Sequence, residues 1–361
     1  MKKKLLVGVI LGLLALGVVG CGGTKDAAKD TTTTTKTPTT EQAQEKTKIR
    51  VAHLPIPGQA LYYIAQAQGY FAEENLEVEF VPIKKSPEVY NLLQAGKVEV
   101  GSAGTAAPLT YLAKDAEFTI VGGLLGEGSA IVVPANSNLK EVSDLKGKKV
   151  ATVRMATGDI VIKAQLEKEG LKATDIQYVE FPSASDSLAA LKSGKVDAAI
   201  SWPPYSDAAV KAGDIKVMKW SGAMAPGHPC CRVVFNNEFI KQNPEAITKF
   251  LTALIKAEKF FKENPDQGLE VVATALKVDK DTIKATLVDE KTSLISADPN
   301  TKAVVEFYEN MKTVGYLKAD AKSPADSIDT SFYKQALEEL AQANPEDSFY
   351  KDALAQYQQN N

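Results

Sequence analysis

The segment from Gly227 to Phe235, with the sequence GHPCCRVVF, gathers the side chains best suited to chemistry. It holds His228, Cys230 and Cys231, although the whole chain has only two histidines and three cysteines. Thiolates are soft metal ligands and good nucleophiles, and an imidazole can serve as a base or as a further ligand. The sequence leaves four roles open for the cysteine pair.

The two adjacent cysteines could be buried apolar side chains, because free cysteine packs well in cores. They could instead form a strained vicinal disulfide, which is possible outside the cytoplasm. They could bind a soft metal as thiolates, with His228 and either Met155 or Met224 completing the set. Finally, Cys230 or Cys231 could be a nucleophile activated by His228.

The spacing of the cysteines narrows the metal alternative. The chain has no CxxC motif and no second cysteine pair, so a closed tetrahedral zinc site is not expected, and no resident cofactor is predicted. Adjacent thiols suit a two-coordinate soft centre such as Hg(II), Cu(I) or an organomercury fragment. The candidate metal ligands are Cys230, Cys231 and His228.

The start of the chain is typical of an export signal. Three lysines precede an apolar run from Leu5 to Val19, which is too short to span a bilayer, and a small residue precedes Cys21. This pattern predicts a signal peptide over residues 1–20. The residues before Cys21 resemble the lipobox of bacterial lipoproteins, so we expect Cys21 to be acylated and to anchor the protein to the extracytoplasmic face of the cell membrane.

Residues 21–47 are rich in Thr, Lys and Gln and are predicted to form a flexible tether, because they offer almost nothing apolar to bury. Residues 48–361 suffice for two lobes of ordinary size. The formal charge of −3 falls to −6 without the three lysines of the signal peptide. This charge argues against a nucleic-acid partner, and only the anchor is expected to touch the membrane.

Strand and helix patterns alternate from residue 48 onward. Strand patterns over 48–54, 76–83 and 98–104 are separated by helical patterns over 59–71 and 87–96. Such alternation predicts an α/β fold with a mainly parallel sheet. The chain beyond about residue 236 is predicted to be mostly helical.

The pattern is then duplicated. LLQAGKVEVGSAG at 92–104 matches AALKSGKVDAAISW at 189–202 with an offset of about 98 residues. Two copies of one α/β lobe are expected rather than a solenoid, because only two units are present. We place lobe 1 at 48–133 and 232–361 and lobe 2 at 134–231, so that two crossings form a hinge with a ligand cleft beside it.

Four segments together carry a family resemblance, namely YYIAQAQGYFAEENLEVEF, LLQAGKVEVGSAGTAAPL, VSDLKGKKVAT and AALKSGKVDAAISWPPY. The chain resembles the solute-binding proteins of ABC importers for nitrate, sulfonates, taurine and thiamine-precursor pyrimidines. The resemblance covers nearly the whole folded body and implies a type II periplasmic-binding-protein fold. The HPCC segment is not the cysteine-rich run of the pyrimidine branch, and it resembles more a branch linked to organometal handling.

In such sheets ligands bind beyond the carboxyl ends of the strands, where turns and helix N-termini converge. Arginine can grip an anionic group, and Trp202 can cover a ligand or pack within its own lobe. The turns could equally be ordinary caps that serve only their own helices. The candidate ligand-binding residues are His53, Pro57, Gln59, Ser102, Gly104, Thr105, Arg154, Met155, Thr157, Gly158, Asp159, Ser185, Trp202, Tyr205, His228, Cys230 and Cys231.

The sequence therefore predicts a monomeric lipoprotein that captures a small solute in its cleft and delivers it to an ABC permease and its ATPase. The solute is expected to be a small organic anion such as a sulfonate, or alternatively a soft metal or organometal species on Cys230 and Cys231. The rival of another class is an enzyme that acts on a pyrimidine precursor through a cysteine and His228. No nucleophile elbow, P-loop or paired carboxylates support that rival, so no enzyme is predicted.

Overall fold

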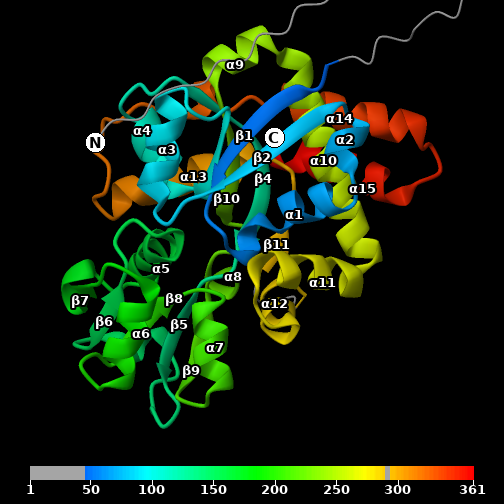
Figure 1. Cartoon of the computed structure of the whole chain (residues 1–361). Coiled ribbons are helices and arrows are strands. Elements are labelled where there is room, and N and C mark those ends of the chain that lie inside the picture. Colours follow the sequence, from blue (N-terminus) through cyan, green and yellow to red (C-terminus); the bar gives the residue numbers. More distant parts are fainter. Residues whose placement is uncertain (1–44, 289–292) are drawn as a thin grey trace, which may run out of the picture. The chain divides into compact units, whose positions relative to one another are not determined.

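The computed structural model describes residues 45–288 and 293–361. The predicted signal peptide, Cys21 and most of the predicted tether lie outside these described residues. Strands and helices alternate through the first two thirds of the described chain, as predicted, and build two sheets (Figure 1). Among the described helices, none combines the length and apolar character needed to cross a bilayer.

The first sheet has six strands in the order β11-β4-β10-β3-β1-β2. Strand β1 pairs in parallel with β2 and β3, whereas β10 is antiparallel to β3 and β4, and β11 is antiparallel to β4. The strands are β1 (Thr47–His53), β2 (Leu76–Pro82), β3 (Val100–Gly104), β4 (Phe118–Glu127), β10 (Pro229–Asn236) and β11 (Ser293–Ile295). We call the part of the protein built on this sheet lobe 1.

The second sheet has five strands in the order β7-β6-β8-β5-β9, and the part built on it is called lobe 2. Its β7-β6-β8 set repeats the parallel β2-β1-β3 set of lobe 1, which agrees with the duplication seen in the sequence. The strands are β5 (Ala130–Pro134), β6 (Lys149–Thr152), β7 (Gln177–Glu180), β8 (Ala198–Ser201) and β9 (Ile215–Trp220).

Both sheets are mixed rather than mainly parallel, because each takes an antiparallel strand from the chain that crosses between lobes. Strand β5 follows the first crossing and pairs with β8 and β9, and β10 follows the second and pairs with β3 and β4. Residues 130–133, which the sequence places in lobe 1, thus pair in the second sheet. Residues 229–231, which it places in lobe 2, pair in the first. The crossings lie at 128–129 and 221–228.

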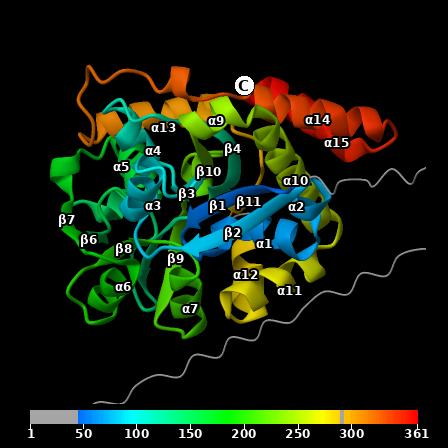
Figure 2. The same cartoon turned by 45° about the horizontal axis from the view of Figure 1, so that its top comes forward.

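Helices cover both faces of each sheet. In Figures 1 and 2, α3, α4 and α13 lie on one side of lobe 1, and α1, α2, α10 and α11 on the other. The helices are α1 (Ala60–Ala67), α2 (Tyr70–Glu73), α3 (Ser86–Gln94), α4 (Ala106–Leu112), α5 (Thr157–Lys168), α6 (Ala184–Lys192), α7 (Tyr205–Lys211), α8 (Ser221–Met224), α9 (Asn237–Gln242), α10 (Pro244–Glu263), α11 (Pro265–Leu276), α12 (Lys280–Leu287), α13 (Thr301–Thr313), α14 (Ser331–Ala343) and α15 (Ser348–Asn360).

The longest helix, α10, shows why this sequence forms these elements. Its apolar residues Ile247, Phe250, Leu251, Leu254 and Ile255 recur at helical spacing, and all five are fully buried in the core of lobe 1. The stripe predicted from the sequence is therefore the face that α10 packs on the sheet.

Helix α5 is buried on two sides because it packs against both lobes. Its Ile160 and Val161 join a core cluster of lobe 1, whereas Ile162 and Leu166 join a core cluster of lobe 2. Apolar residues on more than one side are expected for a helix that lies between two cores. The first turn of α5 consequently lies where the lobes meet (Figure 1).

Candidate functional site

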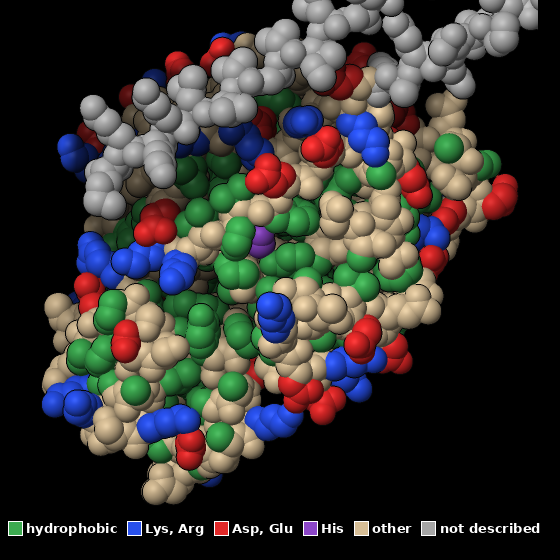
Figure 3. Space-filling view, viewed as in Figure 1, with side chains coloured by type: hydrophobic (Ala, Val, Ile, Leu, Met, Phe, Trp, Pro, Cys, Tyr) green, Lys and Arg blue, Asp and Glu red, His purple; other side chains and the backbone are tan. Residues whose placement is uncertain are grey.

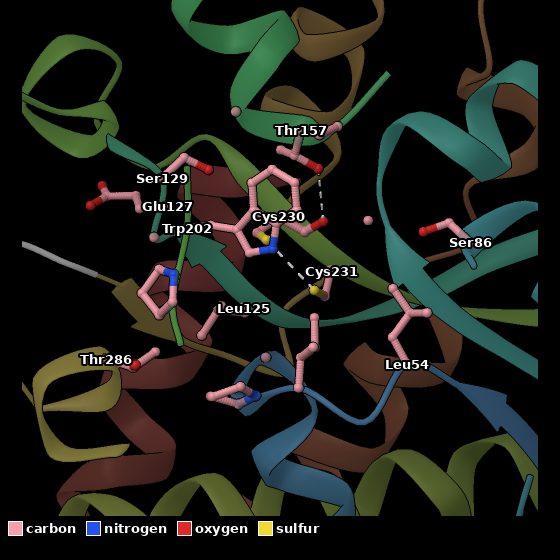
Figure 4. A pocket seen from close by; sticks show the side chains of 18 of the residues that line it. Leu54, Ser86, Leu125, Glu127, Ser129, Thr157, Trp202, Cys230, Cys231 and Thr286 are labelled. Carbon is pink, nitrogen blue, oxygen red and sulfur yellow. Dashed lines mark hydrogen bonds between the residues drawn. The ribbon is translucent and has the colours of Figure 1, made fainter. Parts of the chain in front are cut away.

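A cavity of about 120 Å³ lies between the lobes, and we call it the inner pocket (Figure 4). Its walls come from the turns after β1, β3 and β6, from the turn after β8, from the first crossing and from β10. The lining residues are Leu54, Ile56, Pro57, Gly58, Ser86, Gly104, Ala107, Leu125, Glu127, Gly128, Ser129, Met155, Ala156, Thr157, Gly158, Trp202, Pro203, Cys230, Cys231 and Thr286.

A larger cavity of about 720 Å³ adjoins the inner pocket, and we call it the outer cavity. The two share walls that include Leu54, Met155 and Trp202. The outer cavity is lined in addition by Lys84, Lys85, Arg154, Ser183 and Tyr205, among others. Its volume is within the range typical of small-molecule sites, about 300–1,000 Å³.

Ten of the seventeen candidate ligand-binding residues line these cavities. Those on the inner pocket are Pro57, Gly104, Met155, Thr157, Gly158, Trp202, Cys230 and Cys231. Arg154 and Tyr205 line the outer cavity. The others line neither cavity, and they are His53, Gln59, Ser102, Thr105, Asp159, Ser185 and His228.

Several of those other residues support the walls from behind. The Ser102 hydroxyl donates to the backbone carbonyl of Arg232 over 2.9 Å. The backbone N–H and the hydroxyl of Thr105 both donate to the carbonyl of Cys230, at 2.8 and 2.9 Å. His53 is buried against the aromatic rings of Tyr63 and Phe80, and this burial lowers its pKa.

The two thiols reach the inner pocket together because of a β-bulge. In β10, Pro229 and Cys231 pair with the consecutive residues Gly126 and Leu125 of β4, so Cys230 is an extra residue without a partner in β4. Adjacent residues of a regular strand would point to opposite faces. The bulge instead brings the Sγ atoms of Cys230 and Cys231 within 3.6 Å of each other, without a disulfide (Figure 4).

The hydrogen bond between the two thiols shifts their pKa values in opposite directions. It lowers the pKa of Cys230 and raises that of Cys231, so the first proton leaves Cys230. Cys231 is fully buried, whereas Cys230 is half-buried. A Cβ atom at Gly58 would lie 3.0 Å from the Cys231 sulfur, so the glycine leaves room for the thiol.

His228 is a part of the hinge rather than a partner of the thiols. Its Nε2 lies 2.9 Å from the Ser221 hydroxyl and its Nδ1 lies 3.4 Å from the Pro229 carbonyl. The three candidate metal ligands therefore do not converge. No group of three or more His, Cys, Asp or Glu side chains in the described parts of the chain could hold a metal ion.

The burial of His228 predicts a loss of stability in mild acid. Desolvation lowers the pKa of His228 to about 4, whereas in the unfolded chain it is near 6.5. Between these values only the unfolded state binds the proton, so stability falls as pH falls. We expect His228 to cost about 2 kcal/mol of folding free energy between about pH 7 and pH 5.

Denaturant unfolding of the wild type and of His228→Gln at both pH values measures this cost. Between pH 7 and pH 5 the free energy of unfolding of the wild type should fall by about 2 kcal/mol more than that of the variant. An unchanged difference would contradict a buried, neutral His228.

The two crossings are tied to each other beside the pocket. The Glu127 carboxylate accepts a hydrogen bond from the Gly227 N–H at 2.8 Å. Ser129 and Ser221 exchange two more, from Ser129 N to Ser221 Oγ at 3.1 Å and from Ser221 N to Ser129 O at 2.8 Å. Glu127 and Ser129 were not among the residues predicted from the sequence, although the GEGS motif lies at the first crossing as GHPCC lies at the second.

The charges of the inner pocket do not favour an anion. Glu127 is its one ionisable side chain besides the thiols among the described residues, and none of those lining it is Lys or Arg. Arg154 lies outside and forms an ion pair with Glu180 at 3.1 Å. Arg232 is buried elsewhere, where its Nη1 donates to the carbonyl of Cys231 at 2.9 Å. Burial lowers the pKa of Arg232 to about 10, so it remains a cation at neutral pH.

A buried polar network holds the turn before α5. The carboxylate of Asp159 accepts hydrogen bonds from the Thr152 hydroxyl at 2.5 Å and the Met155 N–H at 3.2 Å, and pairs with Lys163 at 2.7 Å. It also accepts one from the Tyr316 hydroxyl at 2.6 Å. Tyr316 follows α13 and packs on the core of lobe 1, so this bond crosses between the lobes. Asp159 thus positions Met155 without lining the cleft.

Comparison with known proteins agrees with this architecture. The model of the NMT1/THI5-like family matches residues 56–268. A Bacillus subtilis protein, named as a candidate aliphatic sulfonates-binding protein, is 28% identical over 291 residues, which cover 76% of this chain and 84% of that protein. A Saccharomyces cerevisiae protein, named 4-amino-5-hydroxymethyl-2-methylpyrimidine phosphate synthase, is 27% identical over 227 residues, or 59% of this chain and 64% of that protein.

The crystal structure of the periplasmic aliphatic sulphonate binding protein SsuA from Escherichia coli is similar with a TM-score of 0.66 at 22% identity. The match covers 76% of this chain and 89% of that one. This likeness confirms the predicted periplasmic-binding-protein fold. Because the family model also spans more than half of the sequence, the chain belongs to the NMT1/THI5-like family.

Proposed function

We propose that this chain is the extracytoplasmic solute-binding component of an ABC importer, which captures a small solute between its lobes and delivers it to a permease and its ATPase. The inner pocket carries this proposal, because residues of both lobes and of the first crossing enclose it. A solute bound there contacts every part that moves in a hinge closure. The binding-protein names of relatives support the same role.

The predicted segments outside the described residues complete the proposal. Residues 1–20 would be removed on export, acylated Cys21 would hold the protein on the membrane, and the predicted tether would connect it to the folded body, which begins with β1 at Thr47. The permease would then receive the solute from a monomer that stays at the membrane surface. The Leu5–Val19 run and the small residue before Cys21 support this part of the proposal.

We infer that the solute is a soft metal or organometal species, and that Cys230 and Cys231 bind it. Both thiols line the inner pocket at 3.6 Å from each other, and thiolates are the side chains that soft metals prefer. The same pocket has, among its described lining residues, no cationic side chain. A soft cation fits this set of groups better than an anion does.

A small organic anion such as a sulfonate is the second candidate. The sulfonate-binding names of relatives favour it, and so do Lys84, Lys85 and Arg154 in the outer cavity. An anion would sit in the outer cavity, because the basic residues among the described lining of the two cavities all lie there.

The enzyme alternative has less support from the geometry. A general base must reach the proton it removes, either directly or through one water. The hydrogen bonds of His228 go to Ser221 and Pro229 rather than to either thiol. We therefore propose stoichiometric binding without turnover, although the yeast relative is named as a synthase.

Calorimetric titration of the reduced protein with two panels tests the proposal. One panel contains methylmercury, Hg(II) and Cu(I), and the other contains sulfonates, nitrate and pyrimidine precursors. The Cys21→Ser form leaves Cys230 and Cys231 as the only thiols. We expect saturable one-to-one binding of a soft-metal species and an unchanged ligand after incubation. Conversion of a pyrimidine precursor to a product would instead identify an enzyme.

A further inference from the structure

The two connected cavities differ in the charge of their walls. The outer cavity is lined by Lys84, Lys85 and Arg154, and none of its described lining residues is Asp or Glu. The inner pocket is lined by Glu127 and by no basic residue in the part of the chain described. The space-filling view shows Lys and Arg side chains gathered on the left, at the level where the lobes meet (Figure 3).

The positive charge of the outer cavity rests mainly on its two lysines. Arg154 is already paired with Glu180 at 3.1 Å, and its guanidinium lies 4.5 Å from the centre of the Tyr316 ring. Neither Lys84 nor Lys85 has an acidic partner within 4.0 Å in the described chain. The two lysines can therefore attract an anionic group that enters the cavity.

The volumes of the two cavities indicate how much of a solute each could hold. The inner pocket, at about 120 Å³, approaches the roughly 150 Å³ of an apolar cavity that holds one benzene ring. The outer cavity has about 720 Å³ and begins at shared walls such as Trp202 and Met155. A solute larger than one ring must extend from the inner pocket into the outer cavity.

We infer that the solute has two chemically different ends. A soft or apolar end occupies the inner pocket at Cys230 and Cys231, and an anionic end, such as a carboxylate or sulfonate, occupies the outer cavity at Lys84 and Lys85. The inner pocket offers an anionic end no basic partner among its described lining residues, whereas the lysines attract that end outward. This inference rests on the proposed binding of a soft-metal solute in the cleft, and it adds the class of group at the other end.

Two probes of nearly equal shape test the inference. Phenylmercury carries only the soft end, whereas 4-carboxyphenylmercury adds a carboxylate on the opposite side of the ring. Affinities are measured on the Cys21→Ser protein by competition with a fixed concentration of a small free thiol. We expect the carboxylate probe to bind about tenfold more tightly, as two or three partly exposed charge contacts would give, with the advantage shrinking at high salt.

Two double-lysine variants test whether Lys84 and Lys85 cause the higher affinity of the carboxylate probe. In Lys84→Ala/Lys85→Ala the two probes should bind equally, with the phenylmercury affinity unchanged. Lys148→Ala/Lys149→Ala is the matched control, because these adjacent lysines lie at the opposite end of β6 from Arg154, and it should keep the full advantage.

The outcomes distinguish failure of the two-ended solute from failure of the proposed soft-metal binding. Equal affinity of the probes for the parent protein, or an advantage that survives Lys84→Ala/Lys85→Ala, would overturn the two-ended solute and leave the importer function intact. Failure of phenylmercury itself to bind would overturn the soft-metal function and the inference together.

Discussion

Replacing both Cys230 and Cys231 with serine is expected to abolish the binding of methylmercury while leaving the fold intact. Serine keeps the size of the side chain but removes the soft ligand atom. The strand that carries the pair is held through its backbone, and the Cys230 carbonyl accepts hydrogen bonds from the N–H and the hydroxyl of Thr105, which serine preserves. Titration calorimetry with the Cys21→Ser background measures the loss, and thermal unfolding checks the fold.

The single variants refine this expectation. Cys230→Ser removes the half-buried thiol of lower pKa, and Cys231→Ser removes the buried thiol of higher pKa. We expect Cys230→Ser to weaken methylmercury binding more, because the thiolate is the binding form. Met224→Leu in the same background serves as a control for a soft side chain that does not line the inner pocket. Full binding by the double serine variant would refute the thiol anchor.

Tyr316→Phe is expected to weaken solute binding by at least about tenfold without unfolding the protein. The lost bond, from the Tyr316 hydroxyl to Asp159 at 2.6 Å, joins lobe 1 to α5 of lobe 2 and breaks when the lobes part. A hydrogen bond to a charged acceptor contributes about 1.5–3 kcal/mol, and its loss reduces the population of the closed state. Asp159 keeps Thr152, Lys163 and the Met155 N–H as partners.

Stopped-flow kinetics distinguish this role from simple structural support. A lost closure contact raises the dissociation rate constant and leaves the association rate constant almost unchanged. Tyr357→Phe is the control, because its hydroxyl pairs with Thr330 at 2.8 Å and neither residue lines either cavity. If Tyr316→Phe lowered the melting temperature but left both rate constants unchanged, Tyr316 would not hold the lobes closed.

Most of the fold could be predicted from the sequence because the hydrophobic patterns that indicate it are local and repeated. The stripe of α10 and the alternation of strands and helices over 48–104 both reflect burial of one face, which periodicity reports directly. The antiparallel strands that make both sheets mixed could not be predicted. Nothing local in Ala130–Pro134 says that this strand pairs with residues seventy to ninety positions later rather than with the preceding lobe.

The sequence predicted which turns line the site, but it did not predict which residues of each turn face the cleft. The turns after β1, β3, β6 and β8 do line the cleft. Within a turn, however, the sequence does not report which side chain faces inward, so Ser102 and Thr105 hold β10 while Gly104 between them lines the pocket. Strand periodicity alone also predicts opposite faces for Cys230 and Cys231, and only the bulge, which depends on pairing with β4, unites them.

The position of β10 has a consequence for the order in which the molecule can fold. This strand lies between β3 and β4 in the six-stranded sheet, although residues 128–228 separate it from β4. All strands of lobe 2 come from the continuous stretch 130–220. Pairing across a long separation is slow because the loop entropy is lost before contacts form. Lobe 2 can therefore form its sheet before β10 is inserted, and Cys230 and Cys231 reach their places in the inner pocket only when β10 pairs between β3 and β4.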